Sequence, residues 1–242
     1  MTTTLITGAS RGIGEEIAIK FASQNHDLIL LIKNKEKYSS LIKKIKKFNV
    51  KVKCFIGDLK DRKFLDLINK KVKSVDNLVN NAAMANTKHF LKVTHKELDD
   101  LMDVNLKSIF TLSQILSKKM IKYKIRGNII NISSQLGHVG ANNRSIYCMS
   151  KFGLEGLTKS MAMDLGKHGI RVNTVAPTKT IVNKEEKTKT RKRLNIIKKK
   201  IPLRKFSTTK EIASIVFFLT TDAASSITGT SIISDGGWTS GK

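Results

Sequence analysis

The 242-residue sequence contains only two cysteines and two prolines, and it has no long apolar run. Cys54 and Cys148 are far apart and form no C-x-x-C pair, so we expect free thiols in a reducing compartment, not a disulfide framework. Two prolines with 15 glycines are typical of a globular chain and not of a disordered one. The longest apolar runs, such as LILLI at 28–32, are far shorter than the ~18 residues that a membrane span needs.

Signals for export and for metal binding are lacking as well. The first residues, MTTTLITG, enter an expected strand directly and include neither a basic nor an apolar leader segment, so we predict a cytoplasmic protein without a signal peptide. The five histidines include no H-x-x-x-H pair, so we expect no zinc site and assign no metal ligand.

Acidic residues are scarce, because 19 Asp and Glu stand against 45 Lys and Arg and the formal net charge is +26. Such an excess can indicate a polyanionic partner. The lysines are spread over the whole chain, however, and the 6% of aromatic residues do not alternate with the basic runs, so no platform for stacking bases is visible. A solvated lysine-rich surface and a general preference for acidic partners both stay open. We expect no specific nucleic acid and no membrane as partner.

The sequence does contain a regular alternation of short apolar runs with longer amphipathic segments. Strands are predicted at 3–7, 27–32, 50–56, 75–80, 127–133, 169–175 and 229–234. Helices are predicted near 12–24, 35–48, 61–72, 95–121, 145–167 and 208–221, two of them after the capping boxes Thr94–Glu97 and Thr208–Glu211. The alternation predicts an α/β fold, a single Rossmann-type, doubly wound parallel sheet of about seven strands with helices on both faces. We expect one domain over 1–242, in which the basic segment at about 178–206 is a mobile flap or a lid helix.

A glycine-rich turn follows the first predicted strand. In TGASRGIG, residues 7–14, the glycines at 8, 12 and 14 permit a tight turn, and free amides at the start of the next helix face an anion. The spacing G-x-x-x-G-x-G differs from the common G-x-G-x-x-G. Its place between a first strand and a first helix nevertheless predicts a dinucleotide site.

The end of the second strand indicates which dinucleotide is preferred. A site for NAD usually carries an acid about 20 residues after the loop, which accepts from the ribose 2′-hydroxyl. Here the strand ends LLIKNK, with Lys33 and Lys35 but no acid, and Arg11 lies within the loop. These cations attract a 2′-phosphate, so we expect NADP(H) to be favoured over NAD(H). The alternative is that Lys33 is simply one of many surface lysines.

Tyr147 precedes Lys151 by four residues in SIYCMSK, residues 145–151. On a helix the two side chains share a face, with Cβ atoms roughly 5–6 Å apart. Because Y-x-x-x-K is common, this spacing alone favours an ordinary surface helix. The other motifs of the chain decide between the two interpretations.

Eight motifs, in their order and at their distances, resemble those of the short-chain dehydrogenase/reductase family over essentially the whole chain. They are TGASRGIG (7–14), GDL (57–59), NNAA (80–83), VNL (104–106), ISS (132–134), Tyr147 with Lys151, RVNTVAP (171–177) and ITGTSIISDGG (227–237). The nearest resemblance is to bacterial 3-oxoacyl-acyl-carrier-protein reductases. It implies an NADP(H)-dependent oxidoreductase that moves hydride between nicotinamide and a carbonyl or alcohol carbon.

The resemblance also implies a role for individual residues. Tyr147 is implied to be the general acid, and Lys151 the cation that lowers its pKa; a fall from about 10 to 7 needs roughly 4 kcal/mol. Ser134 is implied to donate to the substrate carbonyl, favoured over Ser133 by the thirteen-residue step to Tyr147. Asn105 is implied to support a proton-relay water. The implied cofactor-binding residues are Gly8, Ser10, Arg11, Gly12, Ile13, Gly14, Lys33, Asn34, Asp58, Leu59, Asn81, Ala82, Tyr147, Lys151, Pro177 and Thr180.

Two positions depart from the family pattern, since Ala83 replaces the glycine of NNAG and Thr178 replaces the glycine after Pro177. The resemblance implies a homotetramer that reduces a 3-oxoacyl thioester on acyl carrier protein, in fatty acid biosynthesis. The alternatives are a sugar, polyol or small ketone as substrate, or a non-enzymatic NADP- or polyanion-binding protein. For an acidic carrier protein, we expect Lys124, Arg126, Lys167 and His168 near the mouth of the site.

Overall fold

The computed structural model describes residues 2–35, 38–180 and 188–241, and a single parallel sheet of seven strands forms its centre. The strands are β1 (Thr3–Thr7), β2 (Asp27–Ile32), β3 (Val52–Ile56), β4 (Asn77–Asn80), β5 (Asn128–Ile132), β6 (Arg171–Pro177) and β7 (Ser231–Ser234). Their order across the sheet is β3-β2-β1-β4-β5-β6-β7, and all six pairings are parallel. The chain therefore runs outward from β1 to one edge and then outward from β4 to the other, as a doubly wound sheet does.

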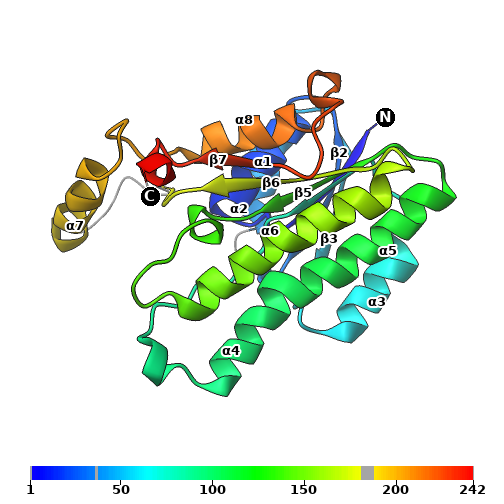
Figure 1. Ribbon diagram of the computed structural model, residues 1–242. Coiled ribbons are helices and arrows are strands. Elements are labelled where there is room, and N and C mark those ends of the chain that lie inside the picture. Colours follow the sequence, from blue (N-terminus) through cyan, green and yellow to red (C-terminus); the bar gives the residue numbers. More distant parts are fainter. Residues whose placement is uncertain (1, 36–37, 181–187, 242) are drawn as a thin grey trace.

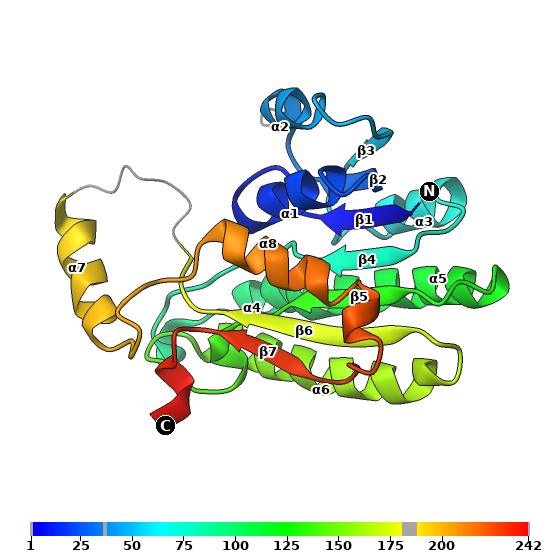
Figure 2. The same ribbon diagram turned by 90° about the horizontal axis from the view of Figure 1, so that it is seen from above.

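Helices cover both faces of the sheet (Figure 1). They are α1 (Gly12–Ala22), α2 (Tyr38–Ile45), α3 (Arg62–Lys71), α4 (His95–Met102), α5 (Ser108–Lys122), α6 (Ser145–Gly166), α7 (Thr188–Lys199) and α8 (Thr209–Phe218). Helices α1, α2 and α8 pack on one face, and α3, α5 and α6 pack on the other. Helix α7 stands beyond the ends of the strands (Figure 2).

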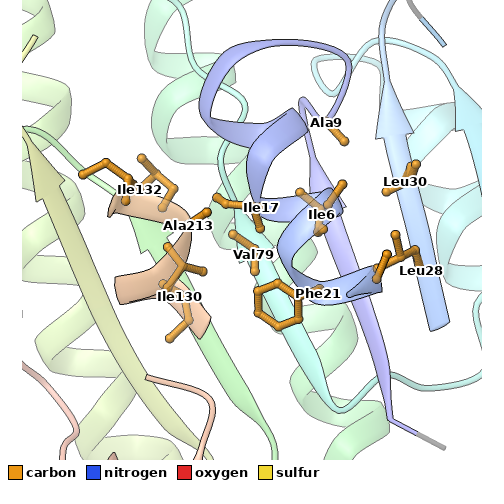
Figure 3. Close-up of a cluster of buried hydrophobic side chains, with 14 of the residues drawn as sticks. Ile6, Ala9, Ile17, Phe21, Leu28, Leu30, Val79, Ile130, Ile132 and Ala213 are labelled. Carbon is orange, nitrogen blue, oxygen red and sulfur yellow. The ribbon is translucent and has the colours of Figure 1, made fainter. Parts of the chain in front are cut away.

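The strands are apolar because both of their faces are buried. In β2, Leu28, Leu30 and Ile32 contribute to the cluster under α1 and α8, while Ile29 and Leu31 contribute to the cluster under α3 and α5. Figure 3 shows the first cluster, in which side chains of α1 and α8 meet the sheet. This two-sided burial explains the continuous apolar runs in the sequence, which lack the alternation of a half-exposed strand.

A chain of buried amide and hydroxyl groups crosses the middle of the molecule. Asn80 of β4 donates to the hydroxyl of Ser113 on α5 (3.1 Å) and to the amide oxygen of Asn131 on β5 (2.9 Å). Asn131 in turn donates to Thr158 on α6 (2.9 Å). Because an unpaired buried polar group costs free energy, this chain favours the one register in which Asn80 faces Asn131.

Most elements expected from the sequence are present. All seven strands and both capping boxes are confirmed, the latter with reciprocal bonds at Thr94–Glu97 and Thr208–Glu211. The single helix expected at 95–121 is wrong, since a π-helical turn at Asp103–Lys107 separates α4 from α5. Within the expected flap at 178–206, residues 181–187 lie outside the described residues, and α7 is a helix.

The expectation about the docking residues is contradicted. Lys124 and Arg126 lie between α5 and β5, at the amino end of β5, and Lys167 and His168 lie between α6 and β6, at the amino end of β6. Ser134 follows the carboxyl end of β5, so the four basic residues and the expected reaction site are at opposite ends of the strands. In the described ranges, no helix is both long enough and apolar enough to cross a bilayer.

The close approach of the β1–α1 turn to the chain after β4 makes Gly14 sensitive to substitution. A Cβ at Gly14 would lie 2.4 Å from both the Asn81 side-chain nitrogen and the Gly8 carbonyl oxygen. We expect Gly14→Ala to lower the free energy of unfolding by about 1–3 kcal/mol, measured by urea denaturation. Gly156→Ala is the control, because no atom lies within 4 Å of the added Cβ. In the interior of α6 this change should raise stability by about 0.5–1 kcal/mol. Equal stability of the Gly14→Ala variant and the wild type would contradict the packing argument.

Candidate active site

A cavity of about 1570 Å³ opens at the carboxyl ends of the strands. Its wall is made by the β1–α1 turn, by the segments that follow β4, β5 and β6, by the start of α6, and by α7. Parallel strands bring all of these segments to one edge of the sheet. The crevice at the carboxyl ends of β1 and β4, where the strand order reverses, is the usual place for a ligand in such folds.

The β1–α1 turn is built for an anion. Gly8 and Gly12 have φ values of 65° and 62°, which a residue with a side chain rarely adopts. Arg11 precedes α1 without capping it through its side chain, and the cavity reaches Arg11 and Gly12. The first amides of α1 therefore meet the cavity at the positive end of the helix dipole. Across the described residues, no three or more His, Cys, Asp or Glu side chains are placed to hold a metal ion.

Asn81 holds this turn in place. Its side chain donates to the carbonyl oxygens of Thr7 (3.0 Å) and Gly8 (3.1 Å), while the Thr7 hydroxyl accepts from the backbone amides of Asn81 and Ala82 (both 2.9 Å). The segment after β4 is thus tied to the end of β1. Asn81 also lines the cavity. It therefore holds the turn in place and is itself within reach of the expected cofactor.

The cavity touches some of the expected cofactor residues and misses others. It is lined by Ser10, Arg11, Gly12, Ile13, Asn81, Tyr147, Lys151, Pro177 and Thr180. It does not touch Gly8, Gly14, Lys33, Asn34, Asp58, Leu59 or Ala82. Gly8 and Gly14 pack closely against the segment that contains Asn81 and Ala82, and Leu59 packs against the core beneath α3.

Lys33 differs from its sequence-based role in a second way. Its ammonium forms an ion pair with Asp58 at 2.7 Å, and the pair lowers the pKa of the Asp58 carboxyl against the opposing effect of burial. The sequence treated these two residues as separate contacts for the phosphate and the adenine. In the structure the carboxylate partly neutralises the lysine. Among the described residues that line this end of the cavity, Arg11 is the cation that forms no ion pair.

Three residues expected to do chemistry meet at one wall of the cavity. Ser134 hydrogen-bonds to the Tyr147 side chain, and its hydroxyl also accepts from the backbone amide of Leu136 (3.1 Å). The Lys151 ammonium lies 5.8 Å from the centre of the Tyr147 ring and donates to the carbonyl oxygen of Ile132 (2.8 Å). The spacing of Tyr147 and Lys151 is therefore not that of a surface helix, because Lys151 is only 1% exposed.

The charges around Tyr147 do not act as the sequence suggested. Burial raises the pKa of the phenol, and the bond to Ser134 and the nearby Arg144 cation offset only part of this rise. Burial also lowers the pKa of the Lys151 ammonium to about 8, against the opposing effect of Glu155. A phenol pKa near 7 would therefore require a further positive charge beside the ring.

Asn105 is fully buried in the π-helical turn between α4 and α5. Its side-chain nitrogen donates to the Met84 carbonyl (2.9 Å) and the Ser150 hydroxyl (3.1 Å), and its oxygen accepts from the Met84 amide (2.7 Å). Both side-chain hydrogens are in use, so none is free for a relay water. Asn105 instead joins the segment after β4 to the helix that carries Tyr147.

Glu155 is a site residue that the sequence reading missed. It is 8% exposed and lies one turn beyond Lys151 on α6. Its carboxylate accepts from Thr174 (2.7 Å) and Ser231 (3.3 Å), and it lies 3.2 Å from the His138 ring. Its i+4 spacing from Lys151, the same as that between Tyr147 and Lys151, was the signal that could have revealed it.

The two departures from the family pattern lie where expected. Ala83 and Thr178 both line the cavity. The Thr178 amide donates to the Ser234 carbonyl of β7 (3.1 Å), and its carbonyl accepts from the Thr180 hydroxyl (3.2 Å). Thr178 is thus fixed by the end of β7.

The Glu155 carboxylate should keep Lys151 charged. We expect Glu155→Gln to lower the pKa of Lys151 below about 8, because the neutral amide no longer favours the ammonium. Titration of the lysine side-chain signals by NMR measures this pKa directly. Asp66→Asn, which removes an exposed charge on α3, is the control and should leave the value unchanged. An unaltered Lys151 pKa in Glu155→Gln would show that the carboxylate has no such effect.

Comparison with known proteins identifies the family. A family model described as Enoyl-(Acyl carrier protein) reductase matches residues 8–239. L-xylulose reductase of Mus musculus is 33% identical over 239 residues, which cover 97% of this chain and 95% of the relative. The 3-oxoacyl-[acyl-carrier-protein] reductase of Rickettsia conorii is 38% identical over 236 residues, with 97% and 95% covered.

Solved structures agree with these relatives. A 4-hydroxyisoleucine dehydrogenase complexed with NADH is 30% identical, with a TM-score of 0.91 and all of both chains covered. The acetoin dehydrogenase of Salmonella typhimurium is 30% identical, with a TM-score of 0.88 over 98% of this chain and 95% of that one. The chain belongs to the short-chain dehydrogenase/reductase family and is an oxidoreductase that uses a nicotinamide cofactor and acts on CH–OH and C=O groups.

Proposed function

We propose that the protein moves hydride between NADP(H) and a carbonyl or alcohol carbon held against Ser134 and Tyr147. The observation that supports this most is the meeting of Ser134, Tyr147 and buried Lys151 at one wall of a cavity whose other end is the anion-binding turn before α1. The reacting oxygen and the cofactor would thus share one cavity.

The protein's own groups supply the proton and hold the oxygen. The nicotinamide, when bound, supplies the hydride for carbonyl reduction or accepts it in alcohol oxidation. Ser134 donates a hydrogen bond to the carbonyl oxygen, where negative charge develops. Tyr147 gives its hydroxyl proton to that oxygen, so that C=O, hydride and proton become CH–OH, and it takes the proton back in the reverse direction. Lys151, largely protonated at pH 7 because its pKa is about 8, stabilises the phenolate left behind.

The residues around the turn fit a dinucleotide. Ser10, Gly12 and Ile13 would hold the bridging phosphates, because the uncapped start of α1 faces the cavity there, and Arg11 would face the 2′-phosphate. Pro177 and Thr180 would lie along the nicotinamide end, near Tyr147 and Lys151. The residues assigned to the adenosine end are Lys33, Asn34, Asp58, Leu59, Asn81 and Ala82. Asn105 acts as a positioning residue through Met84 and Ser150.

Arg11 supports the preference for NADP(H) over NAD(H). It lines the cavity without a described ion-pair partner, whereas Lys33 is paired with Asp58. We expect Arg11→Ala to weaken NADPH binding about tenfold and NADH binding by less than about twofold, because only NADPH carries the 2′-phosphate. Lys33→Ala is the matched variant and should have a smaller effect. Equal weakening of both nucleotides in Arg11→Ala, measured by fluorescence titration, would contradict the assignment.

The first substrate class that we propose is a 3-oxoacyl thioester on acyl carrier protein, as in fatty acid biosynthesis. The identity to the reductase of Rickettsia conorii supports it. The last turn of α7, a helix that contributes Leu194 and Ile197 to the cavity wall, carries Lys198 and Lys199 and offers charge to an acidic carrier, in place of Lys124 and Arg126.

The second substrate class is a sugar, polyol or small ketone. The polar wall near Tyr147, which includes Thr87, Asn142, Arg144 and Thr178, favours a polar substrate over an acyl chain. The relatives named for L-xylulose and acetoin support the same class.

We also propose a cytosolic homotetramer. Five large apolar side chains of α5 and α6 are exposed: Phe110 (50%), Ile121 (37%), Met149 (46%), Phe152 (47%) and Met163 (83%). An exposed apolar surface of this size supports association through these two helices. Both cysteines are free thiols, which suits a reducing compartment.

Tyr147→Phe tests the proton transfer. Without the hydroxyl, we expect kcat/KM for NADPH-dependent reduction of an acetoacetyl thioester or of acetoin to fall about 10²- to 10⁴-fold. Binding of NADPH should stay within about twofold, because the ring and Lys151 remain. Turnover is followed by NADPH absorbance, and binding by fluorescence. A mutant with wild-type turnover would refute the role of Tyr147 as the acid.

A further inference from the structure

Arg144 is a cation at the reaction end of the cavity. It directly precedes α6 and lies three residues before Tyr147. Its guanidinium carbon is 6.0 Å from the centre of the Tyr147 ring, and the residue lines the same cavity as Ser134. This guanidinium is therefore close in space to any substrate whose oxygen reaches Tyr147.

The charge of Arg144 has no counter-charge in the described part of the chain. None of the described carboxylates lies within 4.0 Å of its guanidinium, whereas the cavity-lining Lys44 is paired with Glu15 at 2.5 Å. The acids in the wall of the cavity, Glu15 and Glu16, belong to α1 at the phosphate-binding end. A half-buried guanidinium without a carboxylate partner favours an anionic ligand.

The guanidinium is also held in position before any ligand arrives. One of its terminal nitrogens, Nη1, donates to the carbonyl oxygen of Asn86 at 2.6 Å. A guanidinium has five N–H donors in a fixed plane, so this one bond leaves donors for a carboxylate. Fixing the side chain beforehand reduces the entropy lost on binding.

We propose that Arg144 binds a carboxylate of the substrate, which is then a short hydroxy or oxo acid whose reacting oxygen lies at Ser134 and Tyr147. The proposal rests on the hydride transfer proposed above and narrows its substrate. A 3-oxoacyl thioester has no free carboxylate beside its carbonyl, so Arg144 favours the small polar substrates over the carrier-bound ones.

A purely structural role for Arg144 would give a different result. Through Asn86 it joins the segment after β4 to the start of α6, and losing that bond would disturb the binding of charged and neutral ligands alike. A carboxylate anchor affects only the ligand that carries the charge. An acid and its methyl ester separate the two roles, because they share the same carbon skeleton and the same ketone.

The experiment is isothermal titration of the full-length protein with acetoacetate and with methyl acetoacetate, in the presence and absence of NADP⁺. The oxidised cofactor cannot reduce a ketone, so binding is measured without turnover. The variants are Arg144→Gln, Arg144→Lys and the control Arg62→Gln, which makes the same change on an exposed part of α3. Thermal denaturation of each variant reports its folding.

We expect the wild type and Arg62→Gln to bind the acid about tenfold to a hundredfold more tightly than the ester. Arg144→Gln should abolish that preference, and Arg144→Lys should keep part of it, because the charge remains. Equal affinity for acid and ester in the wild type, no binding of either, or a preference that survives in Arg144→Gln would overturn the proposal. Failure to bind NADP⁺ would count against the proposed hydride transfer and not against the role of Arg144, because the acid and the ester are also compared in the absence of the cofactor.

Discussion

The hydrogen-bond chain from Ser113 through Asn80 and Asn131 to Thr158 fixes the part of the fold on which the site depends. It links α5, β4, β5 and α6 in that order through buried groups. Two of these elements position the side chains that we propose to react, because β5 ends just before Ser134 and α6 carries Tyr147 and Lys151. A slip of one residue between β4 and β5 would leave several buried amides unpaired and would turn the strand faces over. Apolar burial alone would tolerate more than one register, so the asparagines supply the specificity.

Within this frame, the electrostatics of the site arise from burial. Lys151 is held away from water, and its ammonium keeps one carbonyl partner, Ile132, and one nearby carboxylate, Glu155. The Tyr147 phenol is held in its neutral form by the same burial. The protein by itself thus maintains a protonated tyrosine, which suits a group that gives a proton to a carbonyl oxygen. The opposite direction needs a further positive charge at the ring, and an oxidised nicotinamide carries one.

Local signals in the sequence predicted the helices and strands, but they did not predict contacts between residues far apart in the sequence. The apolar runs located all seven strands, and the capping boxes fixed the starts of α4 and α8, since both depend on neighbours in the sequence. The π-helical turn around Asn105 was missed because it depends on partners at Met84 and Ser150. The pairing of Lys33 with Asp58 likewise joins the ends of two different strands. Lys124 and Arg126 were misplaced because they precede the amino end of β5, whereas the cavity lies at the carboxyl ends of the strands.

The packing of α7 is separate from that of the sheet. Leu194 on α7, with Ile201 and Phe206 after it, forms a small cluster with Ile197 and Trp238, apart from both sheet cores. Leu194 and Ile197 also face the cavity. Residues of this part of the cavity wall can therefore change at little cost to the folding of the sheet. A chain of this kind can therefore acquire a new substrate by substitutions in one short segment, while the residues proposed to transfer the proton stay where α6 and β5 hold them.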